Sequence, residues 1–250
     1  LFTRPRRFGK TLNMDMLRTF FEQTAEDTSV YFTDKNIWQQ GEKYIQHQGQ
    51  YPVIYISLKD IKSSDWNMSL LLLKKIIRAE YARHHELLNS DKISIADSDT
   101  YKKVIKNEAD DADYMFSLHD LSQMLHDHHG KKPIIIIDEY DTPIQEGYLN
   151  GYYKEAISFI RNFFSAALKD NAHITMSILT GILRIAKESI FSGLNNIRVD
   201  SVLDDAFNRY FGFTDEEIAV MAAYYDVSAK LGEIKEWYDG YKFGDREFYN

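Results

Sequence analysis

Two short stretches of the chain carry residue types that could bind and hydrolyse a nucleoside triphosphate. The first, RPRRFGKT, ends in Gly9-Lys10-Thr11, which is how a phosphate-binding P-loop ends. In such a loop the glycine lets backbone N–H groups approach the phosphates, the lysine neutralises the β and γ oxygens, and the threonine hydroxyl is a Mg²⁺ ligand. The usual spacing places a glycine five positions earlier, where this chain has Arg4. On this motif alone, a nucleotide site and a basic strand-to-helix turn both remain open.

The second stretch is IIIIDEYD, in which four isoleucines from Ile134 run into Asp138-Glu139. This is the form of a Walker B strand, whose aspartate supports Mg²⁺ and whose glutamate polarises an attacking water. A buried strand that ends in a solvated acidic turn would look similar. However, a GKT loop followed by this acidic strand end favours a P-loop NTPase. The Asp-Glu pair further favours hydrolysis over a bare nucleotide switch.

Apolar periodicity predicts strands that alternate with helices. Strand patterns occupy 1–3, 53–58, 134–137 and 173–181, and helical spacing occupies 12–23, 66–88, 114–130 and 152–168. Such alternation produces a parallel sheet with right-handed crossovers. We therefore predict an α/β fold, a P-loop NTPase with a mostly parallel sheet flanked by helices.

The predicted P-loop domain covers 1–212, and 213–250 is expected to be a small extension with a helix and an aromatic-rich turn or hairpin. The polar, acidic stretch 89–113 is expected to be a loop-rich insertion with one short helix. Leu1 already looks like the end of a strand, so we interpret the sequence as a fragment whose upstream part contains the rest of that strand.

Bulk composition restricts the partners and the compartment. The 30 basic and 38 acidic residues give a net charge of −8, which argues against nucleic-acid binding by the surface as a whole. A local basic patch of Arg4, Arg6, Arg7 and Lys10 leaves the question of nucleic acid open. No apolar run is long enough to cross a membrane. The absence of cysteine excludes disulfides and thiolate metal sites, and we expect a cytoplasmic protein.

Other polar residues have a functional interpretation and a structural one. Thr180 ends the strand ITMSILTG, where it could sense the γ-phosphate, and Arg184 shortly after could contact phosphate or a partner. Helix capping and ordinary surface charge explain the same two residues. The histidines of HDHH (His126, His128 and His129) could bind metal, but histidines near the negative end of a helix dipole are unremarkable.

Four segments resemble the AAA-ATPase-like domain of a large, mostly uncharacterised bacterial family. They are LFTRPRRFGKTLNM, IIIIDEYDTPI, TGILRIAKESIFSGLNN and the terminal WYDGYKFG…FYN, so the resemblance runs across nearly the whole chain. It implies an ATP-binding P-loop domain, which in many members precedes a C-terminal PD-(D/E)XK nuclease-like domain. Carried over by position, Lys10 and Thr11 would bind phosphate and Mg²⁺, Asp138 would support the Mg²⁺, and Glu139 would orient the water.

These arguments lead to two functional hypotheses. The first is Mg²⁺-ATP hydrolysis that drives or gates a partner, either a C-terminal nuclease-like domain or another protein, with an oligomer also compatible. The second is a slow or non-hydrolysing nucleotide-dependent interaction switch. The candidate catalytic residues are Glu139 and Lys10, the Mg²⁺ ligands are Thr11 and Asp138, and the sensors are Thr180 and Arg184. The candidate nucleotide-binding residues are Arg4, Pro5, Arg6, Arg7, Phe8, Gly9, Lys10, Thr11 and Leu12.

Overall fold

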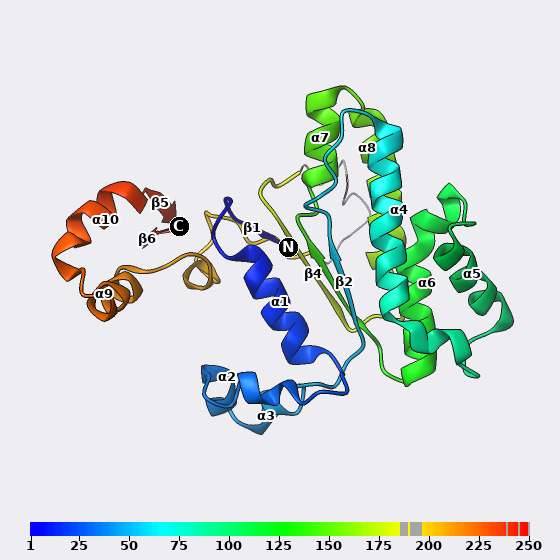
Figure 1. Ribbon diagram of the computed structural model, residues 1–250, viewed down its shortest axis with the longest axis horizontal. Coiled ribbons are helices and arrows are strands. Elements are labelled where there is room, and N and C mark those ends of the chain that lie inside the picture. Colours follow the sequence, from blue (N-terminus) through cyan, green and yellow to red (C-terminus); the bar gives the residue numbers. More distant parts are fainter. Residues whose placement is uncertain (186–189, 191–196, 239, 245, 250) are drawn as a thin grey trace.

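A four-stranded parallel sheet organises the chain in a computed structural model that describes residues 1–185, 190, 197–238, 240–244 and 246–249 (Figure 1). The strand order is β1-β4-β3-β2, and each neighbouring pair is parallel. The mixed α/β class and the parallel sheet are therefore confirmed. The strands are β1 (Phe2–Thr3), β2 (Val53–Ser57), β3 (Ile134–Asp138) and β4 (Met176–Gly181).

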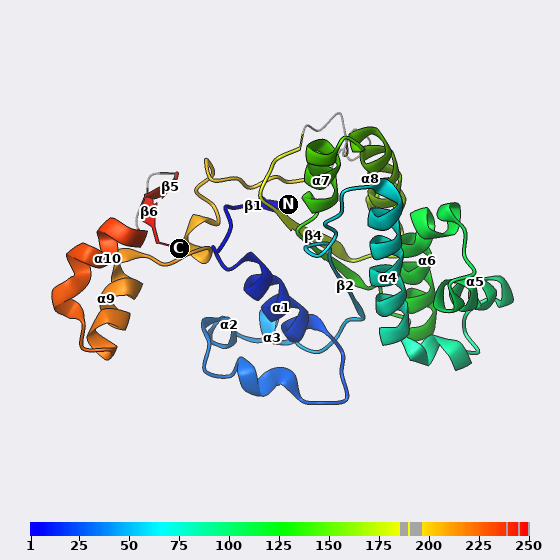
Figure 2. The ribbon, with the colours of Figure 1, turned by 45° about the horizontal axis from the view of Figure 1, so that its top comes forward.

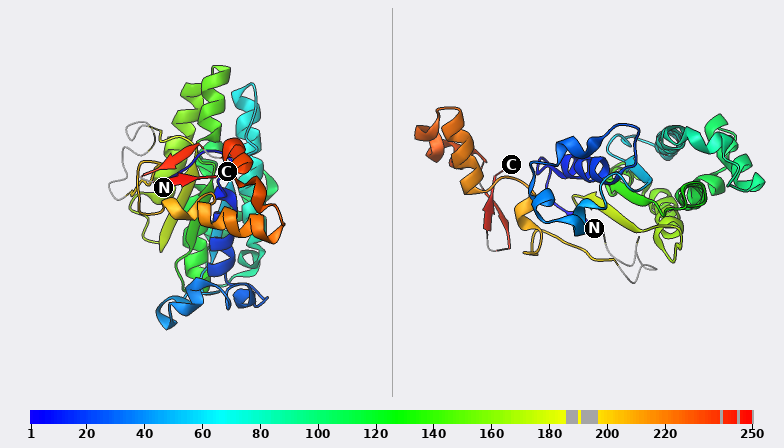
Figure 3. Two further views of the ribbon diagram at one scale, coloured as in Figure 1. Left: turned by 90° about the vertical axis from the view of Figure 1, so that its left-hand side faces the viewer. Right: turned by 90° about the horizontal axis from the view of Figure 1, so that it is seen from below.

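Helices cover both faces of this sheet (Figures 1 and 3). Helix α1 packs on one face, with the short helices α2 and α3 beyond it, while α4, α6 and α8 pack on the other face. The bounds are α1 (Lys10–Phe21), α2 (Asn36–Gln39), α3 (Glu42–Ile45), α4 (Trp66–Arg83), α5 (Ile95–Lys106), α6 (Asp111–His129), α7 (Thr142–Asn150) and α8 (Tyr153–Leu168).

The isoleucines of β3 explain why this strand lies in the middle of the sheet. Ile134 and Ile136 join the apolar cluster under α1, whereas Ile135 and Ile137 join the larger cluster under α4, α6 and α8. All four are at most 1% exposed. A strand that is buried on both faces has no polar side to alternate with, which is why its sequence reads as an uninterrupted apolar run.

The strand register brings three chain segments together at one edge of the sheet. Asp138 at the end of β3 pairs with Ser57 of β2, and Thr180 of β4 lies opposite Phe2 of β1. Because all the strands are parallel, their carboxyl ends share one edge, and ligands of open α/β sheets bind there. β1 pairs with β4 only at Thr180 and Gly181, and Phe2 also forms a parallel bridge with Asp200. Its side of β4 is therefore left open along Met176–Leu179 in the described structure.

The last part of the chain forms a small helical and hairpin extension, which Figure 2 shows beside the sheet domain. It contains α9 (Asp215–Tyr224), α10 (Leu231–Tyr238) and an antiparallel hairpin of β5 (Tyr241–Phe243) and β6 (Arg246–Phe248). The expected helix and hairpin are present, and α10 is an additional helix. The proposed boundary at 212/213 stays a prediction.

Two further predictions from the sequence, on the stretch 89–113 and on membrane-spanning helices, can be compared with the structure. The stretch 89–113, expected to be loop-rich with one short helix, contains α5, which at 12 residues is longer than expected and whose N-terminus is capped by the Ser94 hydroxyl. Among the described residues, no helix combines the length and apolar character needed to cross a bilayer. The motif TGILRIAKESIFSGLNN extends beyond the described residues at 186–189 and 191–196.

Candidate nucleotide-binding site

The loop between β1 and α1 has the backbone shape of an anion-binding turn. Arg7 and Gly9 both adopt left-handed conformations, with φ of 70° and 73°. Gly9 immediately precedes α1, and no described side chain caps this helix N-terminus. A Cβ on Gly9 would meet no atom within 4 Å, so the glycine is needed for its conformation and not for space. Uncapped N–H groups at the start of a helix attract anions such as phosphate.

Lys10 crosses this loop instead of pointing into solvent. Its side chain is only 4% exposed, and its Nζ donates a hydrogen bond of 2.9 Å to the carbonyl oxygen of Pro5. The same ammonium lies 3.6 Å from Oε1 of Glu139 at the end of β3. The candidate phosphate-binding lysine and the candidate base therefore meet directly, although they are far apart in the sequence.

Asp138 joins the first turn of α1 to β4. The carboxylate is fully buried, and its Oδ2 accepts a hydrogen bond of 2.6 Å from the Thr11 hydroxyl. Its Oδ1 accepts a hydrogen bond of 2.5 Å from the Thr180 hydroxyl. Thr11 and Asp138 together present oxygen ligands of the kind that Mg²⁺ prefers, and Thr180 fixes the orientation of the carboxylate. The donor set thus fits a magnesium ion.

Glu139 occupies an uncommon backbone conformation, with φ of 55° in a non-glycine residue. Such a residue costs on the order of 1–3 kcal/mol and persists only where its surroundings fix it. The next residue provides that constraint, because the N–H of Tyr140 donates to the carbonyl oxygen of Thr180 at 2.9 Å. Oε2 of Glu139 also accepts a hydrogen bond of 3.3 Å from the Thr142 hydroxyl. The backbone turn leaves the carboxylate beside Lys10.

Two residues of the front loop have side chains that are committed elsewhere. The guanidinium of Arg4 is fully buried and forms a 2.6 Å ion pair with Asp200, and its backbone N–H donates to Gly181. Phe8 is 1% exposed, and its ring packs 4.7 Å from that of Tyr241. Both side chains therefore make contacts within the protein, and a role of Arg4 and Phe8 in nucleotide binding stays a prediction.

The structure places the other candidate residues in two groups. Lys10, Thr11, Asp138, Glu139 and Thr180 are brought together by the contacts described above. Arg6, Arg7 and Leu12 lie exposed on the loop and the first turn of α1, with Pro5 partly buried beside them. Arg184 is exposed in the segment after β4, three residues beyond Gly181.

Comparison of the sequence with known protein families identifies the family of this chain. Residues 1–191 match the family model described as predicted AAA-ATPase. The chain belongs to this AAA-ATPase-like family. Membership supports a nucleotide-binding domain of the ATPase type, a class that binds ATP, usually with Mg²⁺.

A curated relative extends well beyond this AAA-ATPase-like chain. It is an uncharacterized protein in the vnfD 5' region of Azotobacter chroococcum mcd 1, which is 25% identical over 257 residues. The match covers 99% of this chain but 42% of the relative, so the chain spans less than half the length of that protein. No solved structure gives a significant match.

Sequence reasoning missed Asp141, which lies at the centre of the turn behind the site in this AAA-ATPase-like domain. Its carboxylate is fully buried, and Oδ2 accepts backbone hydrogen bonds from Leu183 at 2.7 Å and Ile182 at 3.0 Å. Burial raises the pKa of Asp141 despite these two hydrogen bonds. The residue fixes the chain where it leaves β4. The sequence signal was present, because DEYD contains a second aspartate three positions after Asp138.

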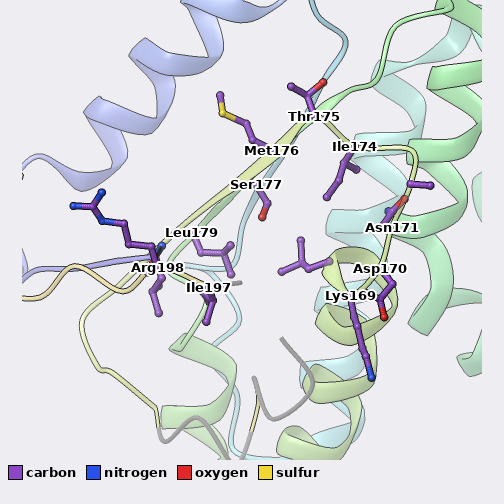
Figure 4. A pocket seen from close by; sticks show the side chains of 13 residues that line it. Lys169, Asp170, Asn171, Ile174, Thr175, Met176, Ser177, Leu179, Ile197 and Arg198 are labelled. Atoms are coloured by element: carbon purple, nitrogen blue, oxygen red, sulfur yellow. Dashed lines mark hydrogen bonds between the residues drawn. The ribbon is translucent and has the colours of Figure 1, made fainter. Parts of the chain in front are cut away.

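A cavity of about 770 Å³ lies away from these residues, along the open side of β4 (Figure 4). Its lining comes from the start of β4, the turn after α8 and the chain around Arg198. It contains none of Lys10, Thr11, Asp138, Glu139 or Thr180. The candidate site of this AAA-ATPase-like domain therefore rests on the chemistry of converging side chains and on the loop backbone, not on a large hollow.

Proposed function

We propose that this domain binds Mg²⁺-ATP at the loop before α1 and hydrolyses it with Glu139 as the base. One observation carries the proposal. The first turn of α1, with Lys10 and Thr11, meets the acidic end of β3, with Asp138 and Glu139. Those are the four groups that phosphate binding, Mg²⁺ ligation and water activation require, and they lie at the sheet edge where such ligands bind.

Lys10 has a resting partner that a triphosphate can replace. Its Nζ donates to the Pro5 carbonyl and pairs with Glu139. Phosphate oxygens at the N-terminus of α1 offer stronger, charged acceptors, so the ammonium transfers its hydrogen bonds from the loop carbonyl to them. The carboxylate of Glu139 is then released from this ion pair and can accept a proton from water.

In the hydrolytic step, water attacks the γ-phosphorus while Glu139 takes its proton, and the bond to the β-phosphate oxygen breaks to release ADP. Thr11 and Asp138 would hold Mg²⁺, which supplies charge neutralisation at the β and γ oxygens. Thr180 holds Asp138 in place through its 2.5 Å hydrogen bond. We assign Thr180 the role of positioning that carboxylate.

The same loop contacts the C-terminal extension, which supports a role in gating a partner. Phe8 lies between the phosphate-binding turn and the hairpin, and its ring centroid is 5.0 Å from that of Phe243. Asn13 of α1 donates a hydrogen bond of 2.8 Å to the carbonyl oxygen of Tyr210. A loop that rearranges around nucleotide therefore moves groups packed against the extension. The partner, either a following nuclease-like domain or another protein, is part of the proposal.

The test measures ATP binding and phosphate release for the wild type, Lys10→Ala and Glu139→Gln. We expect Lys10→Ala to lose ATP binding. Glu139→Gln should bind ATP while its kcat falls by about 100-fold or more, the scale of a lost general base. Lys43→Ala, which removes an exposed lysine on α3, is the matched control and should behave as the wild type. If Glu139→Gln hydrolyses ATP at the wild-type rate, the proposed role of Glu139 is wrong.

The second hypothesis, a nucleotide-dependent switch, predicts a different result. In that case the wild type binds Mg²⁺-ATP, Lys10→Ala does not, and neither the wild type nor Glu139→Gln releases phosphate. The ion pair between Lys10 and Glu139 favours this alternative, because a Glu139 carboxylate that stays paired with Lys10 is not free to take a proton from water. If neither the wild type nor a variant binds ATP, both hypotheses fail.

A further inference from the structure

Two histidines far apart in the sequence face each other at the end of the sheet opposite to Asp138. His126 lies in the last turn of α6, and His173 lies in the connection between α8 and β4. Their Nδ1 atoms are 3.2 Å apart across a separation of 47 positions. The carboxylate of Asp127 completes a group of three side chains whose ligand atoms all lie within 4.8 Å of one another.

The protein holds this connection in place through hydrogen bonds of its own. Oδ1 of Asn171 accepts a hydrogen bond of 2.9 Å from the backbone N–H of His173. Nδ2 of Asn171 donates to the Ser122 hydroxyl of α6 at 3.0 Å and to the carbonyl oxygen of Ala167 at 2.8 Å. His173 is therefore presented to α6 by a fixed turn. A ligand at this position would meet groups that are already arranged.

The spacing of the two nitrogens matches a tetrahedral metal site. Two nitrogens bound about 2.05 Å from a tetrahedral Zn²⁺ lie about 3.3 Å from each other. The observed 3.2 Å is close to this value. Without a cation, the Nδ1–H of one imidazole donates a hydrogen bond to the unprotonated Nδ1 of the other. A metal ion bound between the two nitrogens would take the place of that hydrogen. Asp127 is exposed, so a rotation of its side chain can bring an oxygen to the same point.

We propose that His126, Asp127 and His173 form a binding site for a divalent transition metal, with Zn²⁺ as the best match. Two imidazoles select Zn²⁺ and its neighbours over Mg²⁺, which takes oxygen ligands. Three protein ligands leave a fourth position for water. The site joins the end of α6 to the chain that enters β4, the strand that carries Thr180. It is independent of the proposed nucleotide site.

Neighbouring histidines of the same helix end supply matched controls. His128 contacts Ser90 at 2.8 Å, and His129 lies 3.5 Å from Glu86, so both face away from His173. The sequence run HDHH therefore does not act as a unit. Of its three histidines only His126 takes part, together with Asp127, and the partner His173 cannot be recognised from the local sequence.

The test titrates Zn²⁺ into tag-free, chelator-treated protein in excess Mg²⁺, followed by calorimetry and by thermal unfolding. We expect one equivalent to bind and to raise the unfolding temperature of the wild type and of His128→Ala. His126→Ala and His173→Ala should each weaken binding by at least about tenfold, as expected for loss of a metal ligand or its support. Both should also lose the temperature shift.

Two results would overturn the proposal. One is Zn²⁺ affinity that is unchanged in the double variant His126→Ala, His173→Ala. The other is an equal loss in His128→Ala, which would indicate general surface histidine binding. His173→Gln, which retains a polar side chain, guards against a folding defect and should also weaken binding. Substitution with Co²⁺ gives an independent readout, since intense visible bands of four-coordinate Co²⁺ are expected for the wild type but not for His173→Gln.

Discussion

Arg4 and Asp200 form a buried ion pair of 2.6 Å, although 196 positions separate them. The guanidinium also donates to the carbonyl oxygen of Thr3 at 2.9 Å and lies 4.9 Å above the ring centre of Phe211. The arginine that replaces the first glycine of the usual P-loop pattern therefore connects β1 to the segment that follows β4. Its contribution to the site is to fix the entry of the loop.

Asp200→Asn tests this connection. The substitution leaves the Arg4 guanidinium buried without its counter-charge, so we expect the free energy of unfolding to fall by about 3–5 kcal/mol. Urea denaturation of the wild type and the variant measures the difference. Asp204→Asn, in the exposed turn beside Ser201, is the control and should cause a much smaller loss of stability. A loss of that small size in Asp200→Asn would contradict the argument.

Thr180→Val should weaken the binding of Mg²⁺ without removing one of its proposed ligands. Valine has the shape of threonine but cannot donate to Oδ1 of Asp138, so the carboxylate loses its orientation. We expect Mg²⁺ affinity in the ATP complex to fall by about 10–100-fold, with ATP binding in chelator unchanged. Thr180→Ser keeps the hydroxyl and should restore the affinity. An unchanged Mg²⁺ dependence of phosphate release in Thr180→Val would refute the positioning role.

Phe8 should transmit the nucleotide state of the loop to the hairpin. Hydrogen exchange of the amides in β5 and β6 is expected to change when ATP binds to the wild type. Phe8→Ala removes the ring that packs on Tyr241 and Phe243, so this response should disappear. The variant should also lose about 3–5 kcal/mol of stability, the usual cost of deleting a buried phenylalanine side chain.

Phe8→Leu separates coupling from stability, because it fills most of the same space. It should bind ATP, be more stable than Phe8→Ala and retain part of the exchange response. A full response in Phe8→Ala would show that the loop and the hairpin are independent.

Glu80 gives the fold a defined sensitivity to acid. Burial alone would raise its pKa, but hydrogen bonds from His84 and Arg83 outweigh it and hold the pKa below the ordinary 4.5. The carboxylate also accepts the backbone N–H of Tyr55 at 2.8 Å, which joins α4 to β2.

A depressed folded-state pKa contributes stability above the unfolded-state pKa, and this contribution is lost as pH falls through the folded-state value. We therefore expect the free energy of unfolding to decrease as the pH falls below 4.5. Glu80→Gln should be less stable near neutral pH and should show a shallower pH dependence in that window. Chemical denaturation at several pH values measures both. Parallel pH profiles for the two proteins would contradict this assignment.

Local sequence was sufficient for the central elements of the site. The isoleucine run before Asp138 could only be a strand buried on both faces, and the residues around Gly9 indicated a turn into a helix. The parallel arrangement then brought Thr11 and Asp138 to one edge of the sheet. The sequence also predicted one short helix in 89–113, and the start of α5 could have been placed, because Ser94 and Asp97 have the spacing of an N-cap and the residue that it caps.

The partners of Arg4 and Phe8 could not be predicted from the sequence. An arginine in a basic loop looks the same whether it faces phosphate or a distant aspartate. The choice depends on the path of the chain around Asp200 and on the hairpin that surrounds Phe8, which are tertiary features. The same reason hid His173 from His126, since nothing in the local pattern of either residue indicates the other.

The ion pair between Arg4 and Asp200 has a consequence for where the chain can be shortened. The family match ends at residue 191, before Asp200. A protein cut after residue 191 would keep the buried guanidinium and lose the carboxylate that neutralises it, so we expect it to aggregate on expression. A shortened protein that preserves the loop before α1 should therefore retain Asp200 and Phe211, the ring under the Arg4 guanidinium.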